Sequence, residues 1–241
     1  MGGRLLAFVV AVSQSLPLRR TPLILHAAAL SQALPVLAGL RHGRRLPAAR
    51  RWTIAWCLAL MVGDGVALWW RGSSGTNNLW IQAAGTPIQN VIMLWTLSLW
   101  QRHAVSRLAF RIAIPLFLVT VVALIPTVSD SRTFDTVTRP FQALLLLASA
   151  LYTLVRNAAS DPGGVTRQDW FWVTLGTSLY FAMRVALPPF AAILVSSHQE
   201  LVRLAYFVQA WADIAVFLLI ARGIWCPLPP ARSGGFFSWR R

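Results

Sequence analysis

The sequence predicts an all-α integral membrane protein with seven transmembrane helices, an outside N-terminus, a cytoplasmic C-terminus and a short N-terminal interfacial helix. Three observations support this fold class. The 241 residues are 56% hydrophobic and only 12% charged, with mean hydropathy +0.58, which lies outside the range of soluble globular domains. Apolar runs long enough to cross a bilayer recur along the chain. The basic residues, all of them Arg, gather mostly in the short stretches between these runs.

The predicted spans follow one another with short connections, so residues 21–222 are expected to form one membrane domain. Residues 1–20 precede it as an apolar segment whose core, LLAFVVAVSQSLP, is too short to span. This core resembles that of a signal peptide, and we expect an interfacial helix. Residues 223–241 form a basic, aromatic cytoplasmic tail. The seven spans are 21–40, 53–71, 79–100, 108–128, 137–156, 169–196 and 200–222.

The orientation follows from the uneven distribution of Arg. The connections after the first, third and fifth spans, together with the C-terminal end, carry about twice as many Arg as the opposite side. Because cytoplasmic loops are enriched in basic residues, this predicts a multi-pass protein of a bacterial-type inner (plasma) membrane. The formal net charge of +15 is therefore explained by topology. The expected partner is the lipid bilayer and not nucleic acid.

Three charged residues lie deep within predicted spans: Asp64, Arg184 and Asp213. Counted from the cytoplasmic helix ends, their depths are ~14–20 Å, near the middle of a bilayer. A lone charge at this depth costs roughly 2.5–3.5 kcal/mol, so we expect the three groups to neutralise one another. Two carboxylates against one guanidinium leave one carboxylate for a proton or a cation. Gly63 and Gly65 flank Asp64 and permit close helix approach or local unwinding.

Polar residues accompany these charges. Tyr180 lies one turn before Arg184, Gln209 lies one turn before Asp213, and Gln89 belongs to a polar face of the third span. Polar side chains within a bilayer turn towards the protein interior. The sequence therefore predicts that these residues and the charges form a ligand- or ion-binding cluster. An ion pair that only fixes helix packing is the alternative, and both interpretations stay open.

Other candidates for chemistry are weaker. His26 in the first span suits either pigment or metal ligation or a packing role. Cys57 and Cys226 are predicted near the cytoplasmic face, where thiols stay reduced, so no disulfide is expected. The sequence has no zinc, redox, dinucleotide-binding or P-loop motif, and no nucleophile–base pair. We therefore expect a protein that is not an enzyme, and we assign no cofactor or metal.

Two segments resemble the microbial rhodopsins, which also have seven helices and an outside N-terminus. Thr86–Pro87 is similar to a Thr-Pro pair in their third helix. The segment QAWADIAVFLLIARG is similar to their last helix when Arg222 is aligned, which puts Asp213 at the position of the retinal-binding Lys. Without a Lys no Schiff base forms, so the resemblance implies no retinal and carries no function.

Two functional interpretations remain. The first is a non-enzymatic sensor- or carrier-like protein that binds a small ligand or ion at the Asp/Arg cluster. The second is an accessory or assembly subunit of a larger membrane complex. The tail RSGGFFSWRR suits either an anionic lipid leaflet or docking on other membrane subunits through the chain ends. A lipid-modifying enzyme is a third interpretation, but Asp and Arg alone do not make its catalytic site.

Overall fold

All regular structure in the described part of the chain is helical, which confirms the predicted all-α class. The computed structural model describes residues 21–41, 46–74, 79–128, 138–160, 164–194 and 199–227. The predicted N-terminal interfacial helix and most of the C-terminal tail lie outside these residues. The helices are α2 (Thr21–Ser31), α3 (Ala33–Leu40), α4 (Ala48–Ser74), α5 (Leu79–Leu99), α6 (Ala104–Val128), α7 (Thr138–Ser160), η3 (Val165–Arg167), α8 (Asp169–Leu194) and α9 (Gln199–Trp225).

Four stretches of helix are long and apolar enough to cross a membrane, which supports a multi-pass membrane protein. They are Leu23–Leu40, Ala104–Ala123, Thr138–Ser160 and Leu204–Trp225. Their outward faces carry large apolar side chains. On α6, for example, Leu108, Ile112, Leu116 and Val119 are all more than half exposed. Such a continuous apolar face is suited to lipid rather than to water.

The helices begin and end within a few residues of the predicted spans, with one difference that matters for the interior. α4 begins at Ala48 rather than at residue 53. The prediction that Arg50 and Arg51 belong to a connecting loop is therefore wrong. Both residues are helical, and Arg50 is buried whereas Arg51 is exposed. The apolar pattern alone could not place this boundary, because Arg is also a good helix former.

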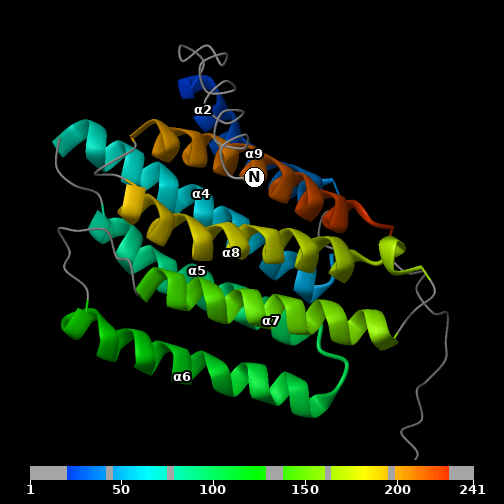
Figure 1. Cartoon of the computed structure of the whole chain (residues 1–241). Helices are drawn as coiled ribbons and strands as arrows, with labels where there is room; N and C mark the ends of the chain where they lie inside the picture. Colours follow the sequence, from blue (N-terminus) through cyan, green and yellow to red (C-terminus); the bar gives the residue numbers. More distant parts are fainter. Residues whose placement is uncertain are drawn as a thin grey trace, which may run out of the picture.

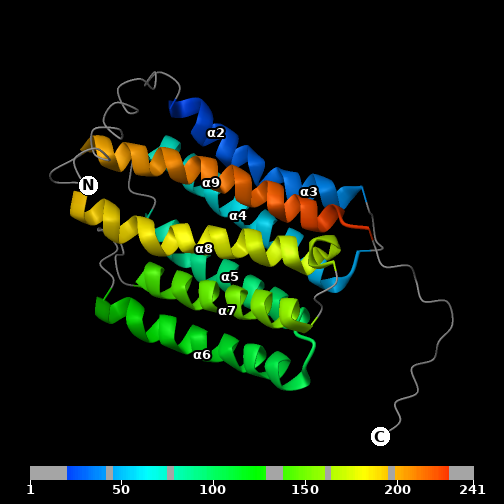
Figure 2. The same ribbon diagram turned by 45° about the vertical axis from the view of Figure 1, so that its right-hand side comes forward.

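The helices form a bundle in which α8 occupies the centre (Figures 1 and 2). α8 packs mainly against α9 and α7, α4 packs mainly against α5, and α2 and α3 cover α9. α6 lies at one edge and contacts chiefly α5. The core between them is apolar and fully buried around Trp56, Met93, Leu146 and Phe217. This arrangement leaves the inner faces of α4, α5, α7 and α8 to enclose the candidate site.

A bend separates α2 from α3. Pro35 has no backbone N–H, so the carbonyl of Ser31 cannot receive its usual helical hydrogen bond. Gln32, between the two helices, keeps right-handed helical dihedrals of −59° and −25°, and its N–H bonds to the carbonyl of Ala29. The bend therefore does not end the span, and it points the Gln32 side chain at α4.

Two glycines allow α8 and α9 to approach closely. A Cβ atom added at Gly176 would lie 3.1 Å from the carbonyl oxygen of Val216 on α9. A Cβ added at Gly223 would lie 2.7 Å from Val173 Cγ2 and 3.0 Å from the carbonyl oxygen of Asp169 on α8. Small residues at helix contacts in membranes let backbones come together in this way. The pairing of these two helices thus depends on the absence of side chains at both positions.

Candidate functional site

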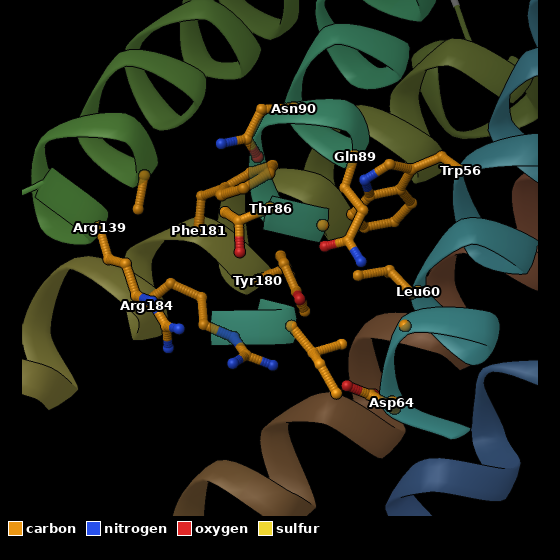
Figure 3. A pocket seen from close by; sticks show the side chains of 14 residues that line it. Trp56, Leu60, Asp64, Thr86, Gln89, Asn90, Arg139, Tyr180, Phe181 and Arg184 are labelled. Atoms are coloured by element: carbon orange, nitrogen blue, oxygen red, sulfur yellow. The ribbon is translucent and has the colours of Figure 1, made fainter. Parts of the chain in front are cut away.

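A cavity of about 130 Å³ lies between α4 and α5 on one side and α7 and α8 on the other (Figure 3). We call it the charged cavity. Its apolar walls include Trp56, Leu60, Ile81, Ala143 and Phe181. Unlike a packing defect, it also carries ionisable groups of both signs and several amides and hydroxyls. These polar lining residues are Asp64, Thr86, Gln89, Asn90, Arg139, Tyr180 and Arg184.

Arg184 lines the cavity and approaches Asp213 of α9. Its Nη2 lies 4.0 Å from Asp213 Oδ2, at the outer limit of an ion pair, and its guanidinium carbon lies 4.8 Å from the centroid of the Tyr180 ring. The Arg184 side chain is 43% exposed and that of Asp213 is 16% exposed. Arg184 Nε and Asp213 Oδ1 are buried without a hydrogen-bond partner. The pair is therefore loose, and the guanidinium keeps donors that Asp213 does not use.

In the part of the chain that the structure describes, the side chain that holds Asp64 is an amide. Gln32 Nε2 donates a 2.7 Å hydrogen bond to Asp64 Oδ2, which joins the bend between α2 and α3 to α4. Within the described residues, no ion pair connects Asp64 to Arg184, although both line the same cavity. Asp64 therefore lines the cavity, and Gln32 holds one of its two carboxylate oxygens.

Helix α7 contributes a second cation that the sequence reasoning missed. Arg139, at the start of the predicted span 137–156, was expected only as one of the Arg residues of the outer side, but it lines the charged cavity. Asn90 Nδ2 of α5 donates a 2.8 Å hydrogen bond to Gln142 Oε1, one turn further along α7, and fixes this wall. With Arg139, two guanidiniums balance the two carboxylates.

Aromatic rings make up much of the apolar lining of the cavity. Trp56 is completely buried and packs edge-on against Tyr180, with ring centroids 5.3 Å apart. Phe181 and Phe217 lie within 6.4 Å of Trp56 by the same measure. α4 is continuous through Gly63, and a Cβ there would lie 2.8 Å from Gln89 Nε2. The predicted local unwinding at Gly63 is therefore wrong, and the space beside Gly63 is taken by the end of the Gln89 side chain.

The remaining predicted candidates lie away from this cavity. Gln209 is buried in α9 one turn before Asp213, but it does not line the cavity. His26 is exposed on α2. Among the residues that the structure describes, no group of three His, Cys, Asp or Glu side chains could hold a metal ion.

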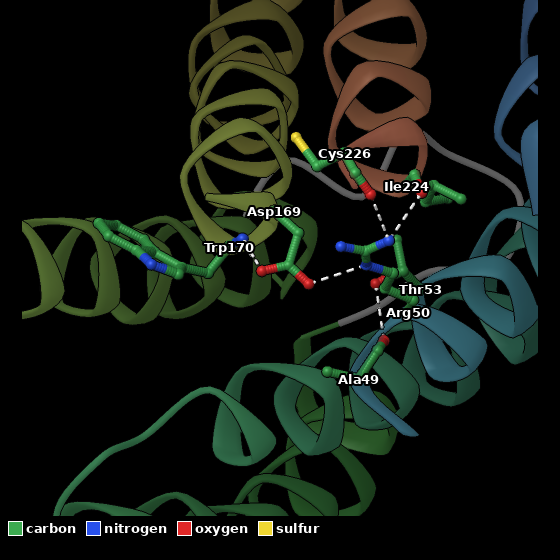
Figure 4. A network of polar contacts seen from close by, with 7 residues as sticks. All are labelled: Ala49, Arg50, Thr53, Asp169, Trp170, Ile224 and Cys226. Carbon is green, nitrogen blue, oxygen red and sulfur yellow. Dashed lines mark hydrogen bonds and ion pairs between the residues drawn. The ribbon is translucent and has the colours of Figure 1, made fainter. Parts of the chain in front are cut away.

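A second polar centre lies at the opposite end of the bundle and is centred on Arg50 (Figure 4). Arg50 Nε donates to Asp169 Oδ2 at 2.9 Å, and its Nη1 donates to the carbonyls of Ile224 at 3.1 Å and Cys226 at 2.8 Å. Asp169 Oδ1 also accepts the N–H of Trp170 at 2.8 Å. We call these contacts the Arg50 network. It ties α4 to the start of α8 and to the last carbonyls of α9, where a cation also favours the helix dipole.

Cys226 lies beside this network. Its side chain is almost fully buried, and burial raises the pKa of its thiol, while the charges of Arg222 and Arg50 act in the opposite direction. A thiol in such a place is predominantly protonated near neutral pH and reacts slowly. Cys57 and Cys226 are both free and buried.

The sequence contained a partial signal for these two centres. Asp169 follows a short connection and opens a helix, which is where a carboxylate favours the helix N-terminus. Its partner Arg50 is 119 residues away, so only the tertiary fold pairs them. Gln32 and Arg139 likewise become site residues only through the packing of distant helices.

Comparison with protein-family models, with curated proteins and with solved structures found no match to this chain.

Proposed function

We propose that this protein is a seven-helix, multi-pass membrane protein that binds a small polar ligand in the charged cavity, as a sensor or carrier does, without catalysing a reaction. One observation carries the proposal. The cavity is lined by Asp64, Arg139 and Arg184 around a space of about 130 Å³. Intramembrane charges around a cavity are typical of substrate and ion pathways. A pocket with a few convergent polar groups is also the default form of a small-molecule site.

The contrast with the Arg50 network supports this assignment. The Arg50 side chain is 2% exposed, and its hydrogen bonds are 2.8–3.1 Å long. Arg184 is 43% exposed, its ion pair is 4.0 Å long, and its Nε has no partner. A charge that serves packing is expected to be fully bonded, because an unmet bond in the interior costs stability. The unused donors of Arg184 are those that a ligand would take.

The position of the cavity supports access from one side of the membrane. Arg139 is the second residue of α7, and Asn90 lies about 16 Å along α5 from its first residue. The cavity therefore extends from one end of the bundle to roughly its middle. In the proposed orientation this end faces outside, in a bacterial-type inner membrane, and the Arg50 network faces the cytoplasm.

Native mass spectrometry of the full chain, released from its own membrane, tests the proposal. We expect a small molecule bound to the folded protein, absent from Arg184→Ala and retained by Arg51→Ala. Arg51 is a matched control, because it is an exposed arginine outside both polar centres. A wild-type preparation that carries no small molecule but a second membrane subunit would contradict the proposal. That result would support the alternative function of an accessory or assembly subunit.

A further inference from the structure

We propose that the ligand of the charged cavity is a small zwitterion with one carboxylate and one ammonium group, such as a short amino acid. This inference rests on the proposed function and names the chemical class of the ligand. It follows from three properties of the site: its charge balance, the separation of its charges onto opposite walls, and its size.

The charge balance excludes ligands with a large net charge. Arg139, Arg184 and Asp64 line the cavity, and Asp213 lies behind Arg184. Among the residues that the structure describes around the cavity, the formal charges of two guanidiniums and two carboxylates cancel. A net anion or cation would bring an uncompensated charge into a space enclosed by the bundle, where charges are screened less than in bulk water. A zwitterion brings both signs and leaves the balance unchanged.

The charges are separated in a way that matches the two ends of such a ligand. Arg139 and Arg184 come from α7 and α8, which pack on each other, whereas Asp64 comes from α4, which packs on α5. In Figure 3 the two arginines lie on one side of the cavity and Asp64 lies on the other, with Tyr180 between them. A carboxylate would bind the guanidinium side, where planar donors suit it. An ammonium group would bind Asp64, whose other oxygen Gln32 already fixes.

The volume of the cavity and its aromatic lining limit the size and polarity of the part of the ligand between its two charged groups. An engineered cavity of about 150 Å³ holds one benzene molecule, so a space of this size takes about six non-hydrogen atoms. Alanine has that size. Trp56, Phe181 and Tyr180 also line the cavity, and their rings suit a methyl or methylene group of the ligand.

Isothermal titration of the purified full chain at pH 7 tests this class with three ligands of equal size. Alanine carries both charges, lactate lacks the ammonium group, and alaninamide lacks the carboxylate. We expect alanine to bind roughly tenfold to a hundredfold more tightly than either analogue, because each analogue loses one charge-assisted contact. Lactate or alaninamide binding as tightly as alanine would overturn the inference.

Asp64→Asn gives the matched variant, because asparagine keeps the shape and an oxygen that can still accept from Gln32. We expect this variant to weaken alanine binding, because the partner of the ammonium group is lost, and to strengthen lactate binding, because a negative charge that repels the anion is removed. Its thermal unfolding should stay unaltered. Equal weakening of both ligands would contradict a role of Asp64 in binding the ammonium group. If none of the three ligands binds while native mass spectrometry still finds an Arg184-dependent molecule, the zwitterion assignment is wrong and the proposed function stands.

Discussion

Removing the Arg50 side chain should be the most destabilising single change among the charged residues of this protein. Arg50→Met retains most of the volume and removes the guanidinium. The substitution leaves Asp169 without its cation and the carbonyls of Ile224 and Cys226 without their donor. Breaking a buried ion pair from one side costs about 3–5 kcal/mol, and each orphaned carbonyl adds up to ~1–3 kcal/mol. Since the Asp169 side chain is 20% exposed, water relieves part of this loss, and we expect a total of about 3–5 kcal/mol.

Thermal unfolding of the purified protein in detergent measures this loss. For a chain of this size, 3–5 kcal/mol corresponds to a decrease in Tm of about 6–20 °C. Arg51→Met is the matched control, since Arg51 is exposed, and its Tm should stay within about 2 °C of the wild type. Asp169→Asn in the Arg50→Met background should recover part of the stability, because the uncompensated carboxylate is then gone. Equal Tm values for Arg50→Met and Arg51→Met would refute the assignment of Arg50 as the tie between α4, α8 and α9.

Three further outcomes are expected. Gly223→Ala should lower stability by about 1–3 kcal/mol in the same assay, because its methyl group would meet Val173 and the Asp169 carbonyl. Gly65→Ala, where an added Cβ meets nothing within 4 Å, should cause no loss, and equal losses would show that α8 and α9 do not pack this closely. In a Cys57→Ala background, alkylation of Cys226 should keep accelerating above pH 8.5, because its raised pKa keeps the thiol protonated where a free cysteine is already half ionised. A rate that levels off near pH 8.5 would contradict this. Reporter fusions should give a periplasmic signal at Gly75 and cytoplasmic signals at Gly43, His103 and Gly163, and a cytoplasmic signal at Gly75 would overturn the proposed orientation.

The helical class could be predicted from the sequence because length and apolar composition determine it locally. The expected spans 79–100 and 169–196 correspond closely to α5 and α8. The start of α4 was missed because an arginine can end an apolar span or continue a helix, and only the buried partner Asp169 decides between them. Local patterns therefore predict the helices well, but not their last turns at charged connections.

The candidate site could be predicted only in part. Counting residues along the helices put Arg184 and Asp213 at similar depth, and the structure gives them a 4.0 Å contact. The depth of a residue in the bilayer does not show how its helix is rotated or which helices lie beside it. Gln32 could therefore not be predicted as the partner of Asp64. Arg139 was missed for a related reason. An Arg at the outer start of a span is expected to reach the membrane surface, and only the packing of α7 against α5 and α8 brings it to the cavity.

Cysteine labelling in intact membranes shows whether the charged cavity is open to polar molecules. In a background without Cys57 and Cys226, Ala143→Cys puts a thiol on the cavity wall, and Ala150→Cys puts one on the same helix, two turns away in the closed core. A small, charged thiosulfonate reagent added from outside should modify Ala143→Cys at least about tenfold faster than Ala150→Cys, because only a hydrated thiol ionises and reacts. Added alanine should slow the first reaction and not the second. Equal and slow labelling of both positions would contradict the account, since the Asp64, Arg139 and Arg184 charges would then surround a closed space that no ligand reaches.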